Sequence, residues 1–406
     1  MSIQRKQIIV NVYSPSTGAL ITTWAGANMF GFSKELDGGP GECIISLDKA
    51  FDYGGNDLLV GNEVEIRISD KDTLSNVWRG DKARTIYRGY ISLIERNIDG
   101  HKESVTVHLL GFYTLLSLDI LKNGAQTTLY SDAAAGVGTA SPAATADIGL
   151  MMRGVIDRYR AETANPKISY DIENIPDTGT TGQYTFKQKT YREAMDKIKQ
   201  MAPSGTHYYI DEDGKIKFTA KPTTPTHRFI FGRHFSKVAV EHSLEKTRNF
   251  FVLWNGEPAG GGLDIYKHYE DDDSISMYGR RAQAVNDYGV NDEDAADLIG
   301  TKFISESKGP DVKVVCTIID NNEDENMGYD IESIQPGDTC SFYGFSSQLA
   351  EIFDDNMLIT AVKYFLDRVE IQVEIKKSGL AKFQEEQDKK IKDIGTDGLG
   401  VPESYT

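Results

Sequence analysis

The sequence predicts a mainly β protein with an α+β part, in which two β-barrel modules flank a small α+β domain. Two observations support this prediction. Runs of alternating apolar and polar residues, bounded by Gly, Asn and Asp, fill the regions near both ends of the chain. The same order of turn and strands also occurs twice, once in each of these regions.

The repeated pattern is a polar turn followed by three strands. Its segments are 60–68, 86–94 and 105–110 in the first copy, and 335–342, 357–364 and 369–375 in the second. Two related β modules in one chain suggest a protein that builds a ring. Chance similarity is the alternative, because a polar turn before an alternating strand is common in all-β proteins.

Composition shifts divide the chain into four predicted units. Residues 1–118 are rich in strands and form the first β-barrel. Residues 119–237 form the α+β domain, which begins with a loop rich in Ala, Gly, Ser and Thr at 123–145. Residues 238–378 form the second β-barrel with one inserted helix. Residues 379–406 form a short C-terminal helix and a flexible tail.

The α+β domain contains two predicted helices and a hairpin. Apolar residues at helical spacing indicate a helix over 147–160. A second helix starts at a capping box in which Thr190 and Glu193 satisfy each other's backbone amides. After this helix, Asp213 and Gly214 stand between two alternating strands and predict a tight hairpin.

Helical signals recur in the last part of the chain. Asn291 or Asp292 is expected to cap a helix over 293–303, the one inserted into the second barrel. An amphipathic segment at 380–394 predicts either a solvent-exposed helix or the start of a coiled coil. The tail at 395–406 is expected to be mobile.

Charge disfavours nucleic-acid binding. The 406 residues include 44 Lys and Arg against 61 Asp and Glu, a net charge of −17, and no segment supplies a basic face for phosphates. An acidic surface would let DNA pass without sticking, because like charges repel. The simpler alternative is that the acidity only keeps the protein in solution.

No membrane or secretion segment is predicted. No window approaches the roughly 18 uninterrupted apolar residues of a membrane helix. The N-terminal residues 1–6 lead directly into alternating residues, without the apolar core of a signal peptide. We therefore expect assembly in a cytoplasm.

Metal-binding and catalytic patterns are weak. Cys43, Cys316 and Cys340 lie in strand-like contexts without CxxC spacing, which predicts small buried side chains. The seven histidines show no metal-site spacing, and no serine has the G-x-S-x-G context of a nucleophile. The sequence predicts no catalytic, cofactor-binding or metal-binding residue, and no enzyme.

Two acidic runs were weighed as sites. The run at 320–330 does not have its glycine at the sixth position of a calcium loop and lacks the closing glutamate, so a solvated hairpin loop is expected. The adjacent carboxylates at 270–273 do not provide the separation that glycoside hydrolysis needs across a sugar. A solvated loop is again the expectation.

Several segments carry a family resemblance. In chain order they are 61–64, 87–91, 190–194 with the hairpin at Tyr208, 249–252, 273–281, 295–296 and 334–338. The Ser-Ile-x-x-Tyr-Gly-x-Arg segment, followed by a helix and an Ile-x-Pro-Gly-Asp turn, is the most specific part. Together they resemble the tail hub or baseplate hub proteins of tailed phages and related injection machines.

The resemblance implies a geometric function in a virion. Such hubs look like homotrimers with two tail-tube-like barrels per chain, so that three chains present a pseudo-six-fold ring. The ring would join the six-fold tail tube to a three-fold central spike or fibre and form part of the DNA conduit. The implied partners are tail tube and distal tail proteins and a central spike, fibre or tape measure protein. DNA would pass without specific binding.

Two other classes remain open. A distal tail ring protein would share one tube-like barrel but would not need the second copy. A carbohydrate-binding or receptor-binding module would expose an aromatic platform, which the 20 tyrosines neither establish nor exclude. If the hub interpretation holds, Tyr278, Gly279 and Arg280 have structural or interfacial roles.

Overall fold

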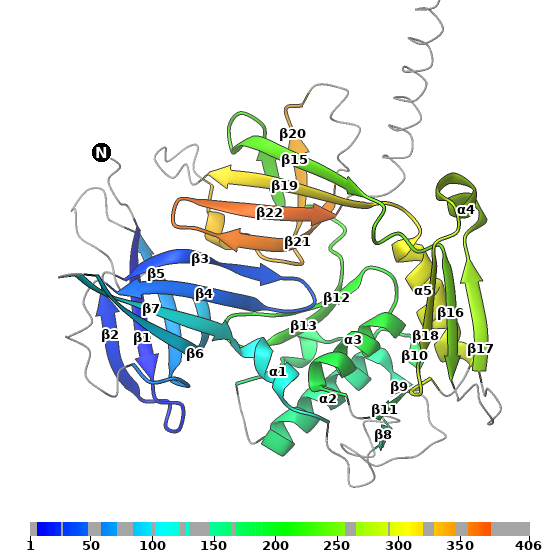
Figure 1. Ribbon diagram of the computed structural model, residues 1–406, viewed down its shortest axis with the longest axis horizontal. Helices are drawn as coiled ribbons and strands as arrows, with labels where there is room; N and C mark the ends of the chain where they lie inside the picture. The colour runs from blue at the N-terminus through cyan, green and yellow to red at the C-terminus, as the bar shows by residue number, and fades with distance from the viewer. Residues whose placement is uncertain are drawn as a thin grey trace, which may run out of the picture.

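A computed structural model describes most of the chain. The described residues are 6–25, 27–47, 58–70, 84–99, 102–121, 127–129, 146–163, 167–182, 184–187, 189–255, 265–290, 293–319, 329–345 and 356–374. The protein is mainly β, as predicted, with one 13-stranded sheet, four small sheets and a few helices (Figure 1). The predicted helix at 380–394 and most of the acidic run at 320–330 lie outside the described residues.

The large sheet contains strands from both ends of the chain. Its strands are β1 (Lys6–Tyr13), β2 (Leu20–Ala25), β3 (Asn28–Glu35), β4 (Pro40–Leu47), β5 (Glu63–Asp70), β6 (Arg84–Asp99), β7 (Lys102–Gly111), β14 (His227–Ile230), β15 (Phe235–Ser243), β19 (Asp311–Ile319), β20 (Thr339–Tyr343), β21 (Met357–Tyr364) and β22 (Arg368–Glu374). Their order is β15-β19-β22-β21-β3-β4-β7-β6-β5-β1-β2, with β20 beside β21 and β14 beside β20. All pairs are antiparallel except β14 with β20.

The sheet contains the same five-stranded unit twice. We call β3-β4-β7-β6-β5 the first module and β15-β19-β22-β21-β20 the second module, because the strands pair in this same order in both. The predicted repeat is therefore present in space. Unlike two separate barrels, however, the modules share one sheet through the pairing of β3 with β21.

The polar turn that opens the repeat, before β5 in the first module and before β20 in the second, has the same hydrogen bonds in both modules. The amide of Gly61 donates to the carbonyl of Ile91 at 2.8 Å, and the amide of Gly337 donates to that of Ile359 at 2.9 Å. Both glycines have positive φ, 94° and 92°, a backbone region that favours glycine. The two turns are therefore equivalent in geometry as well as in sequence.

A β-bulge follows each turn at equivalent positions. The register of β6 with β7 shifts at Ser92, and that of β21 with β22 shifts at Thr360. The Ser92 hydroxyl donates to the His108 carbonyl at 3.0 Å, and the Thr360 hydroxyl donates to the Gln372 carbonyl at 3.2 Å. A bulge bends its strand and increases the local twist. Both modules therefore curve at the same place.

Alternation of side chains places a single apolar core on one face of the large sheet. Residues of both modules contribute to this first core, for example Ile45 and Ile91 from the first and Val362 and Ile371 from the second. Period-2 alternation leaves the intervening polar residues on the opposite face. The two modules are therefore one packing unit.

The α+β domain follows its predicted elements closely. Helices α2 (Ile148–Thr163) and α3 (Tyr191–Met201) pack together, beside the hairpin β12 (Thr206–Ile210) and β13 (Ile216–Ala220). The capping box is present: the Thr190 hydroxyl accepts from the Glu193 amide at 3.2 Å, and the Glu193 carboxylate accepts from the Thr190 amide at 2.8 Å. Gly214 has the positive φ, 76°, that the hairpin turn requires.

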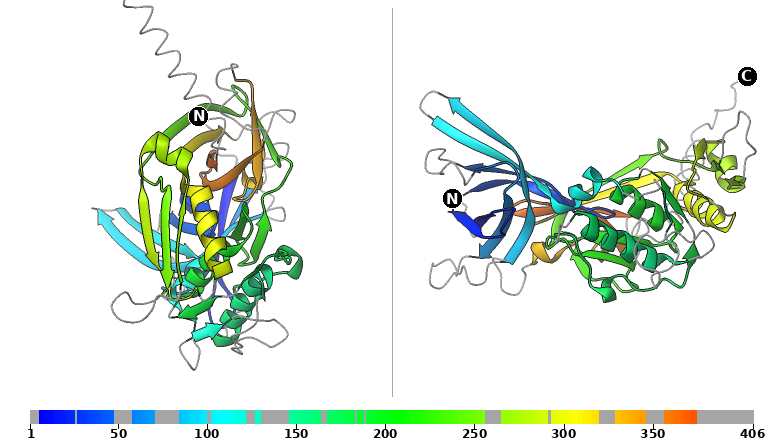
Figure 2. Two further views of the ribbon diagram at one scale, coloured as in Figure 1. Left: turned by 90° about the vertical axis from the view of Figure 1, so that its right-hand side faces the viewer. Right: turned by 90° about the horizontal axis from the view of Figure 1, so that it is seen from below.

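A three-stranded sheet and two helices lie at the far end of the molecule from the first module (Figures 1 and 2). They are β16 (Phe250–Asn255), β17 (Ile265–Glu270), β18 (Ala282–Asn286), α4 (Asp272–Tyr278) and α5 (Glu293–Ser307). Helix α5 is the inserted helix of the sequence analysis, and its predicted cap at 291–292 lies outside the described residues. It packs on α3 in a second core shared with the α+β domain, so it does not pack against the strands of the second module.

The remaining elements are short. They are η2 (Phe112–Thr114), α1 (Leu115–Leu118), β8 (Thr127–Leu129), β9 (Ala146–Asp147), η4 (Ile172–Asn174), β10 (Thr181–Gly182), β11 (Thr185–Lys187) and η5 (Ile331–Ser333). Strand β8 pairs with β11, and β9 with β10. Element η5 contributes Ile331 to the first core, whereas η2, α1, β9 and β11 contribute side chains to the second.

Candidate functional site

The described part of the chain offers no metal cluster. Within it, no group of three or more His, Cys, Asp and Glu side chains could hold an ion. Cys43, Cys316 and Cys340 are free and buried, which confirms their predicted role as small core residues. Among the same residues, no helix is long and apolar enough to cross a membrane.

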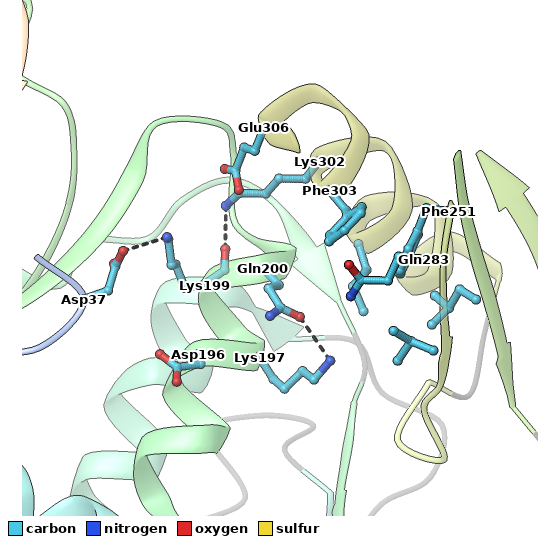
Figure 3. A pocket seen from close by; sticks show the side chains of 13 residues that line it. Asp37, Asp196, Lys197, Lys199, Gln200, Phe251, Gln283, Lys302, Phe303 and Glu306 are labelled. Atoms are coloured by element: carbon cyan, nitrogen blue, oxygen red, sulfur yellow. Dashed lines mark hydrogen bonds and ion pairs between the residues drawn. The ribbon is translucent and has the colours of Figure 1, made fainter. Parts of the chain in front are cut away.

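A cavity of about 330 Å³ lies between α3, α5 and the sheet of β16 and β18 (Figure 3). One wall is apolar and includes Phe251, Leu253 and Phe303, and the other carries lysines from α3 and α5. On the α5 side, Lys302 is buried and points its amine at the end of α3. The amine donates to the carbonyl oxygen of Lys199 and to that of Ala202, the latter at 3.0 Å. Burial lowers the pKa of Lys302 to about 8.

The lysines around this cavity all have partners on the protein. Lys199 lies 2.7 Å from an oxygen of Asp37, and Lys197 lies 2.7 Å from an oxygen of Asp287. The Lys302 amine donates to the Ala202 carbonyl and to the Lys199 carbonyl, which also accepts from the Ala202 amide at 3.1 Å at the end of α3. Two of these lysines are therefore held by ion pairs and the third by backbone carbonyls, and the Lys302 contacts link α5 to α3.

The acidic run at 270–273 is a helix start, and the expectation of a solvated loop was wrong. Asp271 caps α4, where its carboxylate accepts from the Ser274 amide at 2.9 Å, and it pairs with Lys308 at 2.7 Å. Asp272 and Asp273 occupy the first turn. Negative charge is favoured there by the helix dipole, which is why the run ends a strand and starts a helix.

The most specific motif of the sequence has a structural role around Asn249. Its amide nitrogen donates to the Ser274 hydroxyl at 3.1 Å and to the Gly279 carbonyl at 2.9 Å, and its oxygen accepts from the Arg281 amide at 2.7 Å. The Arg280 guanidinium lies 3.5 Å from the centre of the Phe250 ring. Asn249 is buried, so these contacts hold α4 on β16.

The contact between the two modules contains buried polar side chains. We call the pairing of residues 32–35 of β3 with residues 361–364 of β21 the seam. Phe32 and Tyr364 stack across it with ring centres 4.8 Å apart, and the Tyr364 hydroxyl donates to the Ile334 carbonyl. The seam closes tightly at Gly31, where φ is 123° and an added Cβ would lie 2.7 Å from the Tyr364 carbonyl oxygen.

A buried lysine ties three parts of the chain together at the seam. Lys34 is 1% exposed, and its amine lies 2.8 Å from the Glu212 carboxylate and 3.0 Å from the Gln335 side-chain oxygen. Its amine also lies 5.1 Å from the centre of the Tyr364 ring. Burial lowers the pKa of Lys34, although the Glu212 carboxylate opposes this shift. The side chains come from β3, the β12–β13 hairpin and the turn before β20.

That turn is the Ile-x-Pro-Gly-Asp segment of the sequence analysis, at 334–338. The Asp338 carboxylate accepts from the Gln335 amide and lies near the His227 imidazole, both at 2.9 Å. The Gln335 side-chain oxygen also accepts from the Tyr209 hydroxyl at 3.1 Å. The motif therefore positions Gln335 against the seam.

Charged side chains add a second link between the modules. Arg84 on β6 donates to the Asp330 carboxylate at 2.8 Å and to the Glu332 carboxylate at 2.6 Å. Glu332 is largely buried. Because Arg84 and these acids are distant in sequence, the link forms only when the two modules have met.

The sequence analysis identified the 334–338 turn but missed Lys34. A signal was present, because Lys34 alternates in phase with the apolar Phe32 on the same strand and so should face the core. A lysine in that position needs a buried acceptor, and Glu212 and Gln335 are distant in sequence. The arrangement makes a rigid joint between two β modules and contains no reacting group.

The solvent face of the shared sheet carries charges of both signs. Its exposed or half-buried acidic side chains are Glu35, Glu42, Glu63, Glu95, Glu241, Asp311, Glu370 and Glu374, and its basic side chains are Arg67, Arg88, Arg228, Lys237, Lys313, Lys363 and Arg368. His108 lies among them, 2.8 Å from Glu42. This face offers no basic track for a phosphate backbone.

With the fold described, comparison with known proteins is informative. The 43 kDa tail protein of prophage MuSo2 from Shewanella oneidensis has a TM-score of 0.60 at 12% identity, over 91% of this chain and 100% of that one. A tail protein from Neisseria meningitidis has a TM-score of 0.59 at 10% identity, over 92% and 97%. A prophage tail protein from Listeria monocytogenes has a TM-score of 0.51 at 13% identity, over 95% and 99%. This chain has the fold of phage tail proteins.

The phage tail fold extends over nearly the whole chain, including both modules and the α+β domain. Sequence comparison adds nothing to it: no sequence family matches the chain, and no curated protein matches its sequence. At this low identity the likeness concerns the fold alone.

Proposed function

We propose that the protein is a structural component of a phage-type tail, acting as a hub ring at the tail tip or baseplate. The single observation that supports this proposal is the shared sheet of two equivalent modules, joined at a buried seam. A chain with two copies of one ring unit can match a six-fold partner with three chains, and a three-fold partner with the same three chains. The protein would be a homotrimer within the virion.

Two features support the position between tube and spike. The fold resembles that of tail proteins along almost the full length of each of them. The chain as a whole is acidic, with a net charge of −17, so DNA could pass a channel formed by the ring without binding. We propose the tail tube and distal tail proteins on one side of the ring, and a central spike, fibre or tape measure protein on the other. The proposed role requires no catalysis.

The test is the absolute mass of the purified protein, measured by light scattering after gel filtration over a wide concentration range. We expect a trimer, and averaged electron-microscopy images should show a ring with six similar lobes. A stable hexamer would instead favour a distal tail ring protein. A monomer at every concentration, with glycan binding by the exposed tyrosines, would favour a receptor-binding module.

A further inference from the structure

Part of one edge of strand β6 has no paired strand among the described residues, whereas the equivalent edge of β21 in the second module is paired with β3. The first half of β6 pairs with β5, and its whole length pairs with β7. Within the described residues, no strand pairs with the other edge of its second half, 92–98. In the right-hand view of Figure 2, the cyan hairpin of β6 and β7 projects beyond the rest of the first module.

The internal repeat shows what belongs on that edge. Strand β21 is the equivalent of β6, and residues 361–364 pair with β3. By the matching bulges and registers, these residues correspond to 93–96 of β6. In turn, β3 corresponds to β15, which is the last strand of the sheet. Among the described strands β15 pairs with β19, and one isolated bridge links its first residue, Phe235, to Phe231.

We infer that β15 of a second copy of this chain adds to the open edge of β6, in the same antiparallel pairing that β3 makes with β21. This inference rests on the proposed function and specifies its interface. The equivalent positions place Arg96 opposite Val240 of the partner subunit and Glu95 opposite Glu241 of the partner subunit. The contact is head to tail, because β6 and β15 are different surfaces.

Burial supports the same conclusion. In the seam, the core-facing residues Phe32, Val362 and Tyr364 are at most 3% exposed. Their counterparts on the open edges are Val240 and Ile94, which are only partly buried against the first core, and Arg96, which is exposed. An added strand would cover these apolar side chains and satisfy the backbone groups of both edges.

Negative charges on the two edges, Glu95 and Glu241, weaken the proposed strand pairing. Glu95 and Glu241 are both exposed and would stand directly opposite each other across the contact. Like charges opposite each other weaken a strand pair, and charged edge strands prevent uncontrolled association. We therefore expect assembly to become tighter as salt screens this pair.

The first experiment is cross-linking between Glu95→Cys and Glu241→Cys variants. The two single variants are mixed and oxidised, so that only contacts between copies can form a disulfide. We expect covalent dimers from the mixture, and covalent higher species from the double variant. The wild-type protein is the background control, because its three described cysteines are buried. A Thr23→Cys variant mixed with Glu241→Cys tests β2, the other end strand of the sheet, as the partner edge.

The second experiment exchanges charges in the full-length protein. Glu95→Lys should tighten assembly several-fold in sedimentation, and the double variant Glu95→Lys/Glu241→Lys should return it towards the wild-type value. This loss of additivity is expected only if the two positions are adjacent. The matched control is Glu370→Lys, a solvent-face change on β22 in the interior of the sheet, which should show no coupling to Glu241→Lys.

The outcomes separate this inference from the proposed function. An oligomer without cross-linking at 95 and 241, or with cross-linking at 23 and 241, overturns the β6–β15 contact and leaves the ring proposal standing. A monomer at every concentration overturns both. Cross-linking at 95 and 241 with charge coupling in an oligomer supports both.

Discussion

The seam and the open edges are formed by equivalent strands of the two modules, which are paired with each other at the seam and unpaired at the open edges. Where β3 meets β21, the core-facing side chains are buried and a lysine is fully enclosed. Where the equivalent strands β15 and β6 end the sheet or project from it, the corresponding side chains are only half covered. The two modules have the same turn, bulge and strand order. The difference in burial of their core-facing side chains therefore depends on whether a strand of another module pairs with them.

The largest effect is expected when matched core-facing residues at the seam and at the open edge are truncated. Phe32→Ala in the seam should lower the free energy of unfolding by about 3–5 kcal/mol, because it removes a buried ring that stacks on Tyr364. Val240→Ala on the open edge should cost less than about 1 kcal/mol in the dissociated chain. Urea denaturation monitored by circular dichroism measures both. Equal losses would show that the edge is as well packed as the seam.

A second test removes the buried lysine of the seam, Lys34. Lys34→Ala should destabilise the protein by about 3 kcal/mol, because it leaves the Glu212 carboxylate without its buried cation. The double variant Lys34→Met/Glu212→Gln should recover most of the loss. If the double variant is no more stable than Lys34→Ala, the ion pair is not what holds the hairpin at the seam.

Acid should weaken the first module more than the second. Burial raises the pKa of Glu65, but hydrogen bonds from Thr85, Arg88 and Tyr13 outweigh it and lower the pKa to about 2. An unfolded glutamate titrates near about 4.3. The carboxylate therefore stabilises the fold above about pH 4.3, and this contribution, about 3 kcal/mol, is lost as the pH falls towards 2.

The equivalent residue in the second module is Ser341, which is buried and cannot titrate in this range. Glu65→Gln should be less stable than the wild type at pH 6, and the difference should shrink at pH 3. Denaturation curves at the two pH values measure this change. A difference that stays constant would mean that Glu65 is not ionised in the folded protein.

The smallest expected effect concerns the backbone at the seam. Gly31→Ala should cost about 1–3 kcal/mol, because the φ of 123° is unfavourable for alanine and its Cβ would meet the Tyr364 carbonyl. Gly18→Ala, at a turn where nothing lies within 4 Å of the added Cβ, is the control for positive φ alone. Thermal unfolding of both variants separates the close approach from the backbone preference.

Much of the local structure could be predicted from sequence because its causes are local. The capping box at Thr190, the hairpin turn at Gly214 and the helix over 293–303 each depend on residues within a few positions. The repeat was also visible, since both copies use the same polar turn and alternation. The misread segment at 270–273 shows the limit: an acidic run suits a loop or a helix start, and the neighbouring strand decided between them.

Local sequence patterns specify that the chain is mainly β and that it carries one strand pattern twice. These properties follow from alternation, turn residues and spacing, which act over short distances. Only the tertiary structure decided that the two modules share one sheet, that Lys34 meets Glu212 and Gln335, and that β6 keeps an edge open. The reason is physical: strand pairing and burial join residues hundreds of positions apart, and no local pattern specifies which edges will meet.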